Sequence, residues 1–176
     1  MSKYLYTVID IAIYFYSVDF KHSDKNKVME LLWEEKDTLL EVKYRKDKVI
    51  FFKSVNREME KYLLDSDDKE TNAINKILED IGSSFTINTL YFEQNVIEAF
   101  FRVIKLKLTY TEDTNNIKMK LRTLLRYFGY LRRSQQFVDN VKRTLRSLGL
   151  VTYLKRYELC DVSIIKLDDM MMIRLK

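Results

Sequence analysis

The stretch that decides the fold reads LLRYFGYLRRSQQFVDNVKRTLRSLGL and covers residues 124–150. The apolar residues of its second half recur at the spacing of one helical face, and they are Phe137, Val138, Val141, Leu145 and Leu148. Ser134 comes just before this run and suits the first cap of a helix, whereas Gly149 follows it and suits a helix end. The sequence therefore predicts an amphipathic helix that ends at Gly149.

A second helix is predicted immediately before it, over Ile117–Phe128. Its apolar residues are four, three, one and three positions apart, and they are Ile117, Leu121, Leu124, Leu125 and Phe128. This spacing predicts one buried face, and the basic residues at steps of four on the other side are Lys118, Arg122 and Arg126. Gly129 suits the left-handed position that ends a helix, so Gly129–Arg133 is predicted to be a short turn between two helices.

The polar face of the later helix carries residue types that can recognise bases. It is predicted to expose Gln136, Asn140, Arg143 and Ser147, flanked by Gln135, Lys142 and Arg146. Arginine can pair with guanine through two hydrogen bonds, and asparagine or glutamine can do the same with adenine. Beyond this helix, apolar runs at 162–167 and 170–175 are predicted to form a β-hairpin around Asp168-Asp169. The order helix, turn, helix, hairpin predicts a winged helix-turn-helix.

The positive charge of the chain is concentrated in the same region. The net charge is +5, but residues 111–176 hold 14 Lys and Arg against 7 Asp and Glu, whereas residues 1–110 hold 17 against 19. Within Lys118–Arg156 there are 11 basic residues and one acid, Asp139. Such a block is typical of a protein that binds a polyanion, although a solvated basic face gives the same count. The candidate nucleic-acid-binding residues are Lys118, Arg122, Arg126, Arg132, Arg133, Gln136, Asn140, Lys142, Arg143, Arg146, Lys155 and Arg156.

These residues also carry a resemblance. The pattern L-L-x-x-F-G-x-x-R-R, followed by an amphipathic helix and L-x-x-x-G-L, resembles a small winged-helix-like module of bacterial regulatory and restriction-associated proteins. The matching residues are Leu124, Leu125, Phe128, Gly129, Arg132, Arg133, Leu145, Gly149 and Leu150. The resemblance covers residues 117–165 and implies a winged helix that binds nucleic acid, with no catalytic residue carried over. The chain departs from the module after Leu150, where the relatives carry a Pro-Asp-Phe turn, because it has no proline.

The rest of the chain is predicted to be mainly helical. Residues 1–110 are expected to form one domain with an interaction or dimerisation role, and residues 111–176 the winged-helix-like domain. The predicted helices of the first domain cover 4–18, 25–36, 56–64, 69–81 and 87–108, the last being a candidate dimerising helix. Two short strands at 39–44 and 48–53 are expected to form a β-hairpin. The predicted fold class is therefore mainly α with short β-hairpins, an α+β protein.

Several classes of site are disfavoured by composition. With no proline and only three glycines, the chain has no glycine-rich phosphate loop. His22 and Cys160 are the only histidine and cysteine, which argues against structural zinc and multi-histidine sites, and no cofactor is expected. A lone cysteine is typical of a reducing compartment, so a cytoplasmic location is expected. The apolar stretch Tyr4–Phe20 contains Asp10 and Asp19, so it is predicted to be a buried helix and no membrane partner is expected.

An enzymatic alternative rests on Glu41-Val42-Lys43. An E-x-K strand preceded by an aspartate, here Asp24 or Asp37, is how many metal-dependent nucleases hold magnesium and position water. The same alternation is produced by any half-buried strand. A second alternative is a protein adaptor that uses its basic surface and the methionines Met170–Met172, which an edge strand packed into the core also explains.

The leading hypothesis is a non-enzymatic protein that binds nucleic acid. Double-stranded DNA is favoured over RNA as the partner, and the expected role is a transcription regulator or accessory factor, with a homodimer possible. The basic C-terminal segment and its helical scaffold carry this hypothesis.

Overall fold

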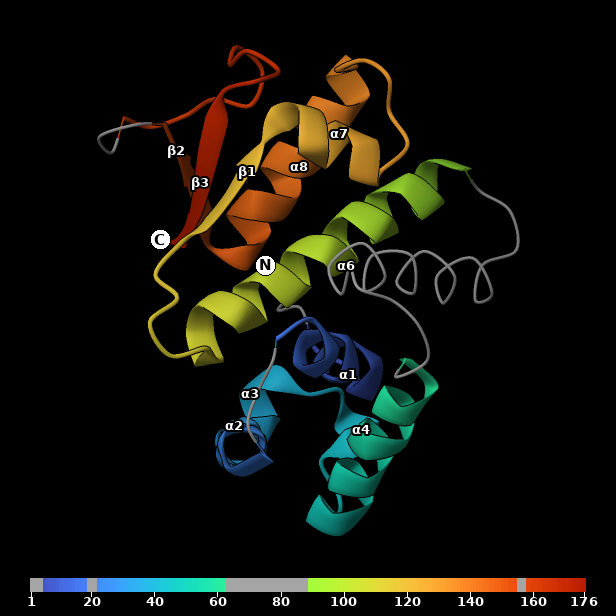
Figure 1. Cartoon of the computed structure of the whole chain (residues 1–176). Coiled ribbons are helices and arrows are strands. Elements are labelled where there is room, and N and C mark those ends of the chain that lie inside the picture. Colours follow the sequence, from blue (N-terminus) through green and yellow to red (C-terminus); the bar gives the residue numbers. More distant parts are fainter. Residues whose placement is uncertain (1–4, 19–21, 63–88, 155–157) are drawn as a thin grey trace. The chain divides into compact units, whose positions relative to one another are not determined.

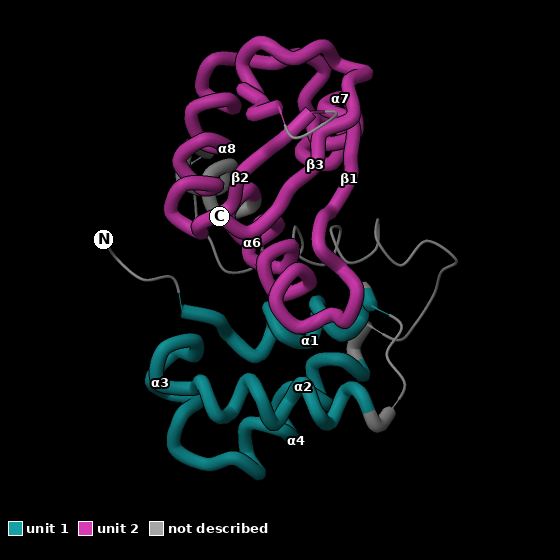
Figure 2. Tube along the Cα trace, turned by 90° about the vertical axis from the view of Figure 1, so that its left-hand side faces the viewer, with its two compact units in different colours: residues 1–77 teal, residues 78–176 magenta. Residues whose placement is uncertain are grey.

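The computed structural model describes residues 5–18, 22–62, 89–154 and 158–176. The chain divides into unit 1, residues 1–77, and unit 2, residues 78–176 (Figure 2). The sequence placed the division near residue 110. The structure places it earlier, because the helix α6 (Thr89–Tyr110) packs on α8 (Gln135–Leu148) and β3 (Met170–Leu175) of the C-terminal unit.

In its described part, unit 1 is built from helices. They are α1 (Val8–Ser17), α2 (His22–Glu34), α3 (Lys36–Leu39), the 3-10 helix η1 (Val42–Tyr44) and α4 (Lys48–Tyr62). Five consecutive residues of α1, Ile11–Phe15, are at most 3% exposed, and α1 packs on α4. The prediction of a buried helix in the apolar stretch is thus confirmed. The helix begins at Val8 because Thr7 and Asp10 form a capping box there.

The predicted β-hairpin at 39–53 is wrong. Leu40 makes only an isolated bridge with Tyr6, and residues 42–44 form η1. Residues 48–53 belong to α4, whose first turn is capped by the Asp47 carboxylate accepting from the backbone N–H of Ile50 (2.9 Å). Phe51 and Val55 are buried one helical turn apart, so the helical period decides this segment over its β-favouring composition.

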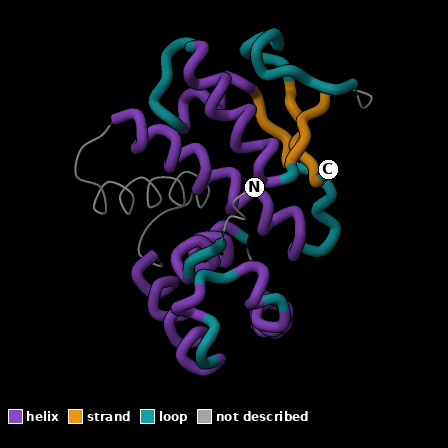
Figure 3. Tube along the Cα trace, turned by 180° about the vertical axis from the view of Figure 1, so that it is seen from behind, coloured by secondary structure: helices purple, strands orange, loops and turns teal. Residues whose placement is uncertain are grey.

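Unit 2 combines helices with a small sheet. After α6 come β1 (Ile117–Lys120), α7 (Leu121–Tyr127), α8, β2 (Leu150–Tyr153) and β3 (Figure 1). The three strands are antiparallel in the order β1-β3-β2, coloured orange in Figure 3. The register places Ile173 of the central strand opposite both Ile117 and Thr152. α8 packs against α6 and β2, so one face of this helix is covered from two sides.

The structure corrects two predicted elements of this unit. Residues 117–128 are not one helix, because Ile117–Lys120 pairs with β3 and the helix begins only at Leu121. Lys118 therefore does not share a helical line with Arg122. The second correction concerns residues 162–167, which form turns instead of a hairpin strand. The methionine-rich strand β3 is accordingly the central strand of the sheet and not an edge strand.

The connection between α7 and α8 follows the prediction. Gly129 has a φ of +72° and directly follows the helix cap, while the N–H of Tyr130 donates to Leu125 O (2.9 Å) and that of Gly129 to Arg126 O (3.0 Å). These two bonds are those of a Schellman motif. The Ser134 side chain accepts from the N–H of Phe137 (3.1 Å) and caps α8, and Gly149, with a φ of +67°, ends it.

The described residues thus form a mixed α+β protein with seven α-helices and a three-stranded antiparallel sheet. None of the helices in this described part is long and apolar enough to cross a membrane.

Candidate nucleic-acid interface

The helix α8 has one buried and one exposed face. The five apolar residues that the sequence assigned to the core, from Phe137 to Leu148, are all at most 6% exposed. The exposed residues of the helix are Gln135, Gln136, Asp139, Arg143 and Arg146. They fall on one side at helical steps of three and four, and the Gln135 amide donates to the Asp139 carboxylate (3.0 Å). Two glutamines and two arginines are therefore presented together on the outer side of α8.

Asn140 does not belong to this exposed face. The sequence placed it there, but its side chain is 6% exposed and Thr144, one turn later, is 3% exposed. The buried arc of α8 is wider than the apolar pattern indicates, because both α6 and β2 pack against this helix. The prediction that Asn140 is exposed is therefore wrong.

Arg122 of α7 is bound to an acid of the loop before β3. Its Nε and Nη2 donate to the two oxygens of Asp168 at 2.9 and 2.8 Å, a bidentate ion pair between residues 46 positions apart. The hydrogen bonds from Arg122 lower the pKa of Asp168, and the charges of Arg122, Lys120 and Arg126 lower it further. The same pairing raises the pKa of Arg122. Three cations therefore act on one exposed carboxylate.

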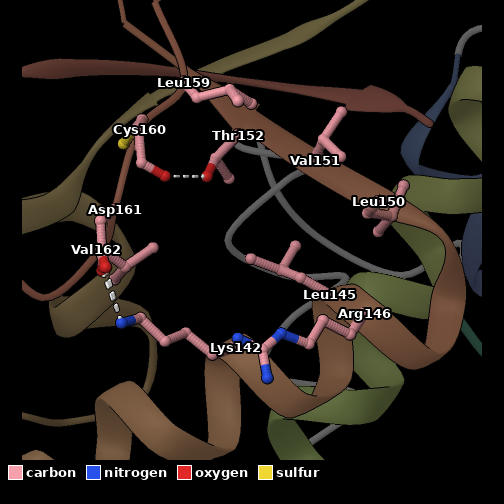
Figure 4. A pocket seen from close by; sticks show the side chains of 10 residues that line it. All are labelled: Lys142, Leu145, Arg146, Leu150, Val151, Thr152, Leu159, Cys160, Asp161 and Val162. Carbon is pink, nitrogen blue, oxygen red and sulfur yellow. Dashed lines mark hydrogen bonds and ion pairs between the residues drawn. The ribbon is translucent and has the colours of Figure 1, made fainter.

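Lys142 of α8 is bound to the same loop at its other end. Its Nζ lies 2.7 and 2.8 Å from the two oxygens of Asp161 and 3.2 Å from Ser163 Oγ (Figure 4). Asp161 also accepts hydrogen bonds from the Ser163 N–H (2.7 Å) and Oγ (2.5 Å). The bond from Lys142, followed by those from Ser163, lowers the pKa of Asp161 to about 2.

Arg133 holds the middle of this loop. Its Nη1 donates to the carbonyl oxygens of Val162 (3.1 Å) and Ile165 (2.6 Å). We call residues 161–169 the acidic loop, since three aspartates and one lysine, Lys166, are its charged residues. Of the candidate residues, Arg122, Arg133 and Lys142 thus hold the acidic loop on the two helices and the turn between them.

The remaining candidates are placed as follows. Lys118 and Arg126 are exposed on β1 and α7, and Arg132 is exposed in the turn before α8. Lys155 and Arg156 lie outside the described residues. Two exposed residues that the candidate set omitted also belong here, Lys120 on β1 and Gln135 on α8. The alternation of Lys118 and Lys120 around buried Met119 was the signal for the first.

A small cavity of about 220 Å³ lies between α8, β2 and the segment that leads into the acidic loop (Figure 4). Lys142, Arg146 and Asp161 are among its polar lining residues, and Leu145 and Leu150 among its apolar ones. Cys160 also lines it, and burial raises the pKa of this thiol. Cys160 is held beside β2 by its N–H, which donates to Thr152 O (2.9 Å), and by its carbonyl, which accepts from Thr152 Oγ1 (2.8 Å).

The strand that the alternative nuclease site requires is not formed. Glu41 and Lys43 form an ion pair with a separation of 3.0 Å, but they flank Val42 at the start of η1 instead of alternating along a sheet. Within the part of the chain that the structure describes, no group of three or more His, Cys, Asp and Glu side chains could hold a metal ion.

Comparison of the chain with protein-family models, with curated proteins and with solved structures finds no match. The function must therefore be inferred from the geometry of unit 2.

Proposed function

We propose that unit 2 is a winged helix-turn-helix that binds double-stranded nucleic acid, DNA in the first place, as a regulator or accessory factor. The observation that carries the proposal is the outer face of α8, where Gln136, Arg143 and Arg146 are exposed on a helix whose opposite face is buried. A helix of this kind fits the major groove, where arginine and glutamine side chains can reach the base edges.

The order of elements supports the same proposal. A first helix, α6, is followed by β1, by the pair α7 and α8 with a turn closed by Gly129, and by β2 and β3. The third strand lies between the first two, and a loop connects β2 to β3. In a winged helix this loop is the wing. Here its described part is bound to α7 and α8 by hydrogen bonds and ion pairs.

Charge supports a polyanionic partner. Arg132 precedes α8, Arg126 and Lys120 lie on or beside α7, and all three are exposed. Phosphate contacts of such residues supply sequence-independent affinity, and glutamine and arginine on α8 would add discrimination between bases. The proposed division of labour is therefore phosphate binding from α7 and the turn, with base contacts from α8.

The proposal is tested by fluorescence anisotropy of a labelled 20-base-pair duplex over a salt series starting at about 50 mM, where phosphate-driven binding is strong. We expect the variant Arg143→Ala/Arg146→Ala to bind about tenfold to a hundredfold more weakly, because each lost contact costs about 1 kcal/mol or more. Because the proposal assigns these two arginines to base edges, the slope of log affinity against log salt should change little, whereas each lost phosphate contact would make it shallower by about 1.

The matched control is Lys53→Ala/Arg57→Ala, which removes two exposed cations from α4 of unit 1. This variant has the same net charge as the test variant, so it should bind as the wild type does if the interface is on unit 2. Equal losses in both variants would mean that bulk charge alone drives binding. Absence of duplex binding at about 50 mM salt would rule the proposal out.

One observation favours a second candidate, a protein-binding adaptor. Three large aliphatic side chains of unit 2 are strongly exposed, Leu131 at 97%, Ile164 at 78% and Leu159 at 73%. Exposed apolar side chains mark a protein interface when they form one contiguous patch, whereas single ones are common on protein surfaces. An affinity for a partner protein that is lost in Leu131→Ser but kept in Arg143→Ala/Arg146→Ala would support the adaptor.

The homodimer expected through α6 stays a prediction. Among the described side chains of this helix, Ile97, Phe101 and Leu106 are buried. Light scattering against the chain mass of 21.3 kDa tests whether a dimer forms.

A further inference from the structure

The Asp168 carboxylate is bound by one cation and lies within the electrostatic influence of two others. Arg122 donates hydrogen bonds to this carboxylate through Nε and Nη2, and the charges of Lys120 and Arg126 both lower the pKa of Asp168. The pair is open to solvent, since the side chain of Arg122 is 44% exposed and that of Asp168 is 62% exposed. An anion from outside can therefore reach the same cations.

The geometry of this pair matches that of a phosphate contact. Two parallel N–H donors of one guanidinium bind two oxygens of one anion, and a phosphate group offers the same two oxygens. The two neighbouring cations, Lys120 on β1 and Arg126 on α7, are exposed and would add to a phosphate contact as they now act on Asp168. The carboxylate of Asp168 thus stands where a phosphate of a nucleic acid backbone would bind.

The other contacts of the acidic loop differ from this one. Asp161 is bound by Lys142 and by two donors of Ser163, and Arg133 binds two backbone carbonyls that carry no net charge. The carbonyl of Leu167 accepts from the N–H of Arg122 (2.8 Å), which fixes the backbone next to Asp168. The acidic loop therefore remains bound through several other contacts when the Asp168 side chain alone dissociates from Arg122.

We propose that Lys120, Arg122 and Arg126 form a phosphate site for the nucleic acid backbone and that Asp168 is its internal competitor. Full engagement of this site requires a phosphate to displace the carboxylate from Arg122. This inference rests on the function proposed above and adds regulation to it, because the acidic loop then sets the affinity of the protein for every duplex equally.

The Asp168 carboxylate is able to dissociate from Arg122. Ion pairs between exposed side chains contribute little net stability, since water screens the attraction and two long side chains must be fixed. A phosphate that enters gains three cations, while the released Asp168 is hydrated by solvent. The duplex must nevertheless break one ion pair that a neutral side chain at this position would not make.

The test compares Asp168→Asn with Glu158→Gln in the full-length protein by the anisotropy assay. Both variants remove one negative charge from the connection between β2 and β3, but only Asp168 is bound to Arg122. We expect Asp168→Asn to bind the duplex about threefold to tenfold more tightly than the wild type, because the phosphate then has no carboxylate to displace from Arg122. Glu158→Gln should stay within about twofold of the wild type. Equal gains in the two variants, or weaker binding by Asp168→Asn, would overturn the inference and leave the proposed function intact.

A second readout separates this inference from the proposed function. The ¹⁵N–¹H signal of Arg122 Nε, assigned by its loss in Arg122→Lys, is followed during titration with pyrophosphate. We expect it to shift at lower pyrophosphate concentration in Asp168→Asn than in the wild type. If duplex binding is absent but this difference is seen, the phosphate site and its competitor stand without the DNA. Identical titrations in the two proteins would refute the competitor.

Discussion

Single glycine residues lie where the helices α7 and α8 end. Gly129 and Gly149 both have positive φ angles, +72° and +67°, and a Cβ added to either would meet nothing within 4 Å. Any cost of substitution therefore comes from the backbone conformation itself and not from a clash. In this conformation an L-residue loses about 1–2 kcal/mol relative to its preferred regions, with asparagine losing less than alanine.

We therefore expect Gly129→Ala to lower the free energy of unfolding by about 1 kcal/mol and Gly129→Asn to lower it by less. Urea unfolding followed by circular dichroism measures both. The two variants share the same open surroundings, so a clash cannot explain a difference between them. A stable Gly129→Ala variant would mean that the turn does not require the left-handed conformation.

The carboxylate of Asp161 links stability to pH. Its pKa is about 2 in the folded protein, below the value of about 3.9 expected in the unfolded chain. A lowered folded-state pKa stabilises the ionised form, so this stabilisation is present above about pH 4 and is lost as the pH falls toward 2. The side chain is open to solvent, so screening keeps the effect small.

Asp161→Asn should accordingly lower the free energy of unfolding by about 0.5 kcal/mol at pH 6 and by close to nothing at pH 2. Guanidinium unfolding at the two pH values gives the difference. Since the same variant is compared with the wild type at each pH, other titrating groups cancel. A loss that is as large at pH 2 as at pH 6 would show that the Lys142 pairing is not its cause.

At the scale of elements, α4 offers a matched test of the helix against the expected strand. Val49 is 60% exposed and Val55 is fully buried on the same helix. A strand over 48–53 would place Val49 on the same face as buried Phe51, because alternate residues share a face. The helix instead places Val49 outside and Val55 inside.

Val55→Ala should therefore lower the free energy of unfolding by about 2 kcal/mol, the cost of removing two buried carbon groups and leaving a small void. Val49→Ala should change it by no more than about 0.5 kcal/mol. Thermal or urea unfolding of the two variants decides between the assignments, since a large loss in Val49→Ala is what the strand requires.

Elements formed by interactions between residues close in the sequence could be predicted, whereas elements that depend on distant residues could not. α8 was predicted with its cap, its end and its buried apolar residues because all of those signals lie within 16 positions, from Ser134 to Gly149. The strand β1 was missed because its conformation depends on Ile173, which is far along the chain and pairs with Ile117. The spacing of apolar residues around Ile117 fits a helix or a strand equally over four residues.

The same range explains the errors in the candidate interface. The charge count in Lys118–Arg156 was correct, but no local pattern reveals that Arg122 binds Asp168 or that Arg133 binds Ile165, 32 residues away. The burial of Asn140 likewise follows from the packing of two elements on α8. The ion pairs between distant segments must be known before the cations of a basic segment can be assigned to a binding surface.

For the whole molecule, the pairing of basic residues with the acidic loop limits the number of phosphates that the segment Lys118–Arg156 can neutralise. Three of the 11 basic residues of the segment, Arg122, Arg133 and Lys142, hold the acidic loop. Six others are exposed on β1, α7, the turn and α8, and they are Lys118, Lys120, Arg126, Arg132, Arg143 and Arg146. Lys155 and Arg156 lie outside the described residues and can add at most two contacts.

The slope of log affinity against log salt is about −0.9 for each phosphate neutralised. The six exposed cations, together with Lys155, Arg156 and the Arg122 that a phosphate releases from Asp168, set the limit, so we expect a wild-type slope no steeper than about −8 on duplex DNA. The salt series of the anisotropy assay measures this value directly. A slope near −10 would mean that Arg133 and Lys142 are also released on binding, whereas a slope shallower than about −3 would mean that only about three of these cations reach phosphate.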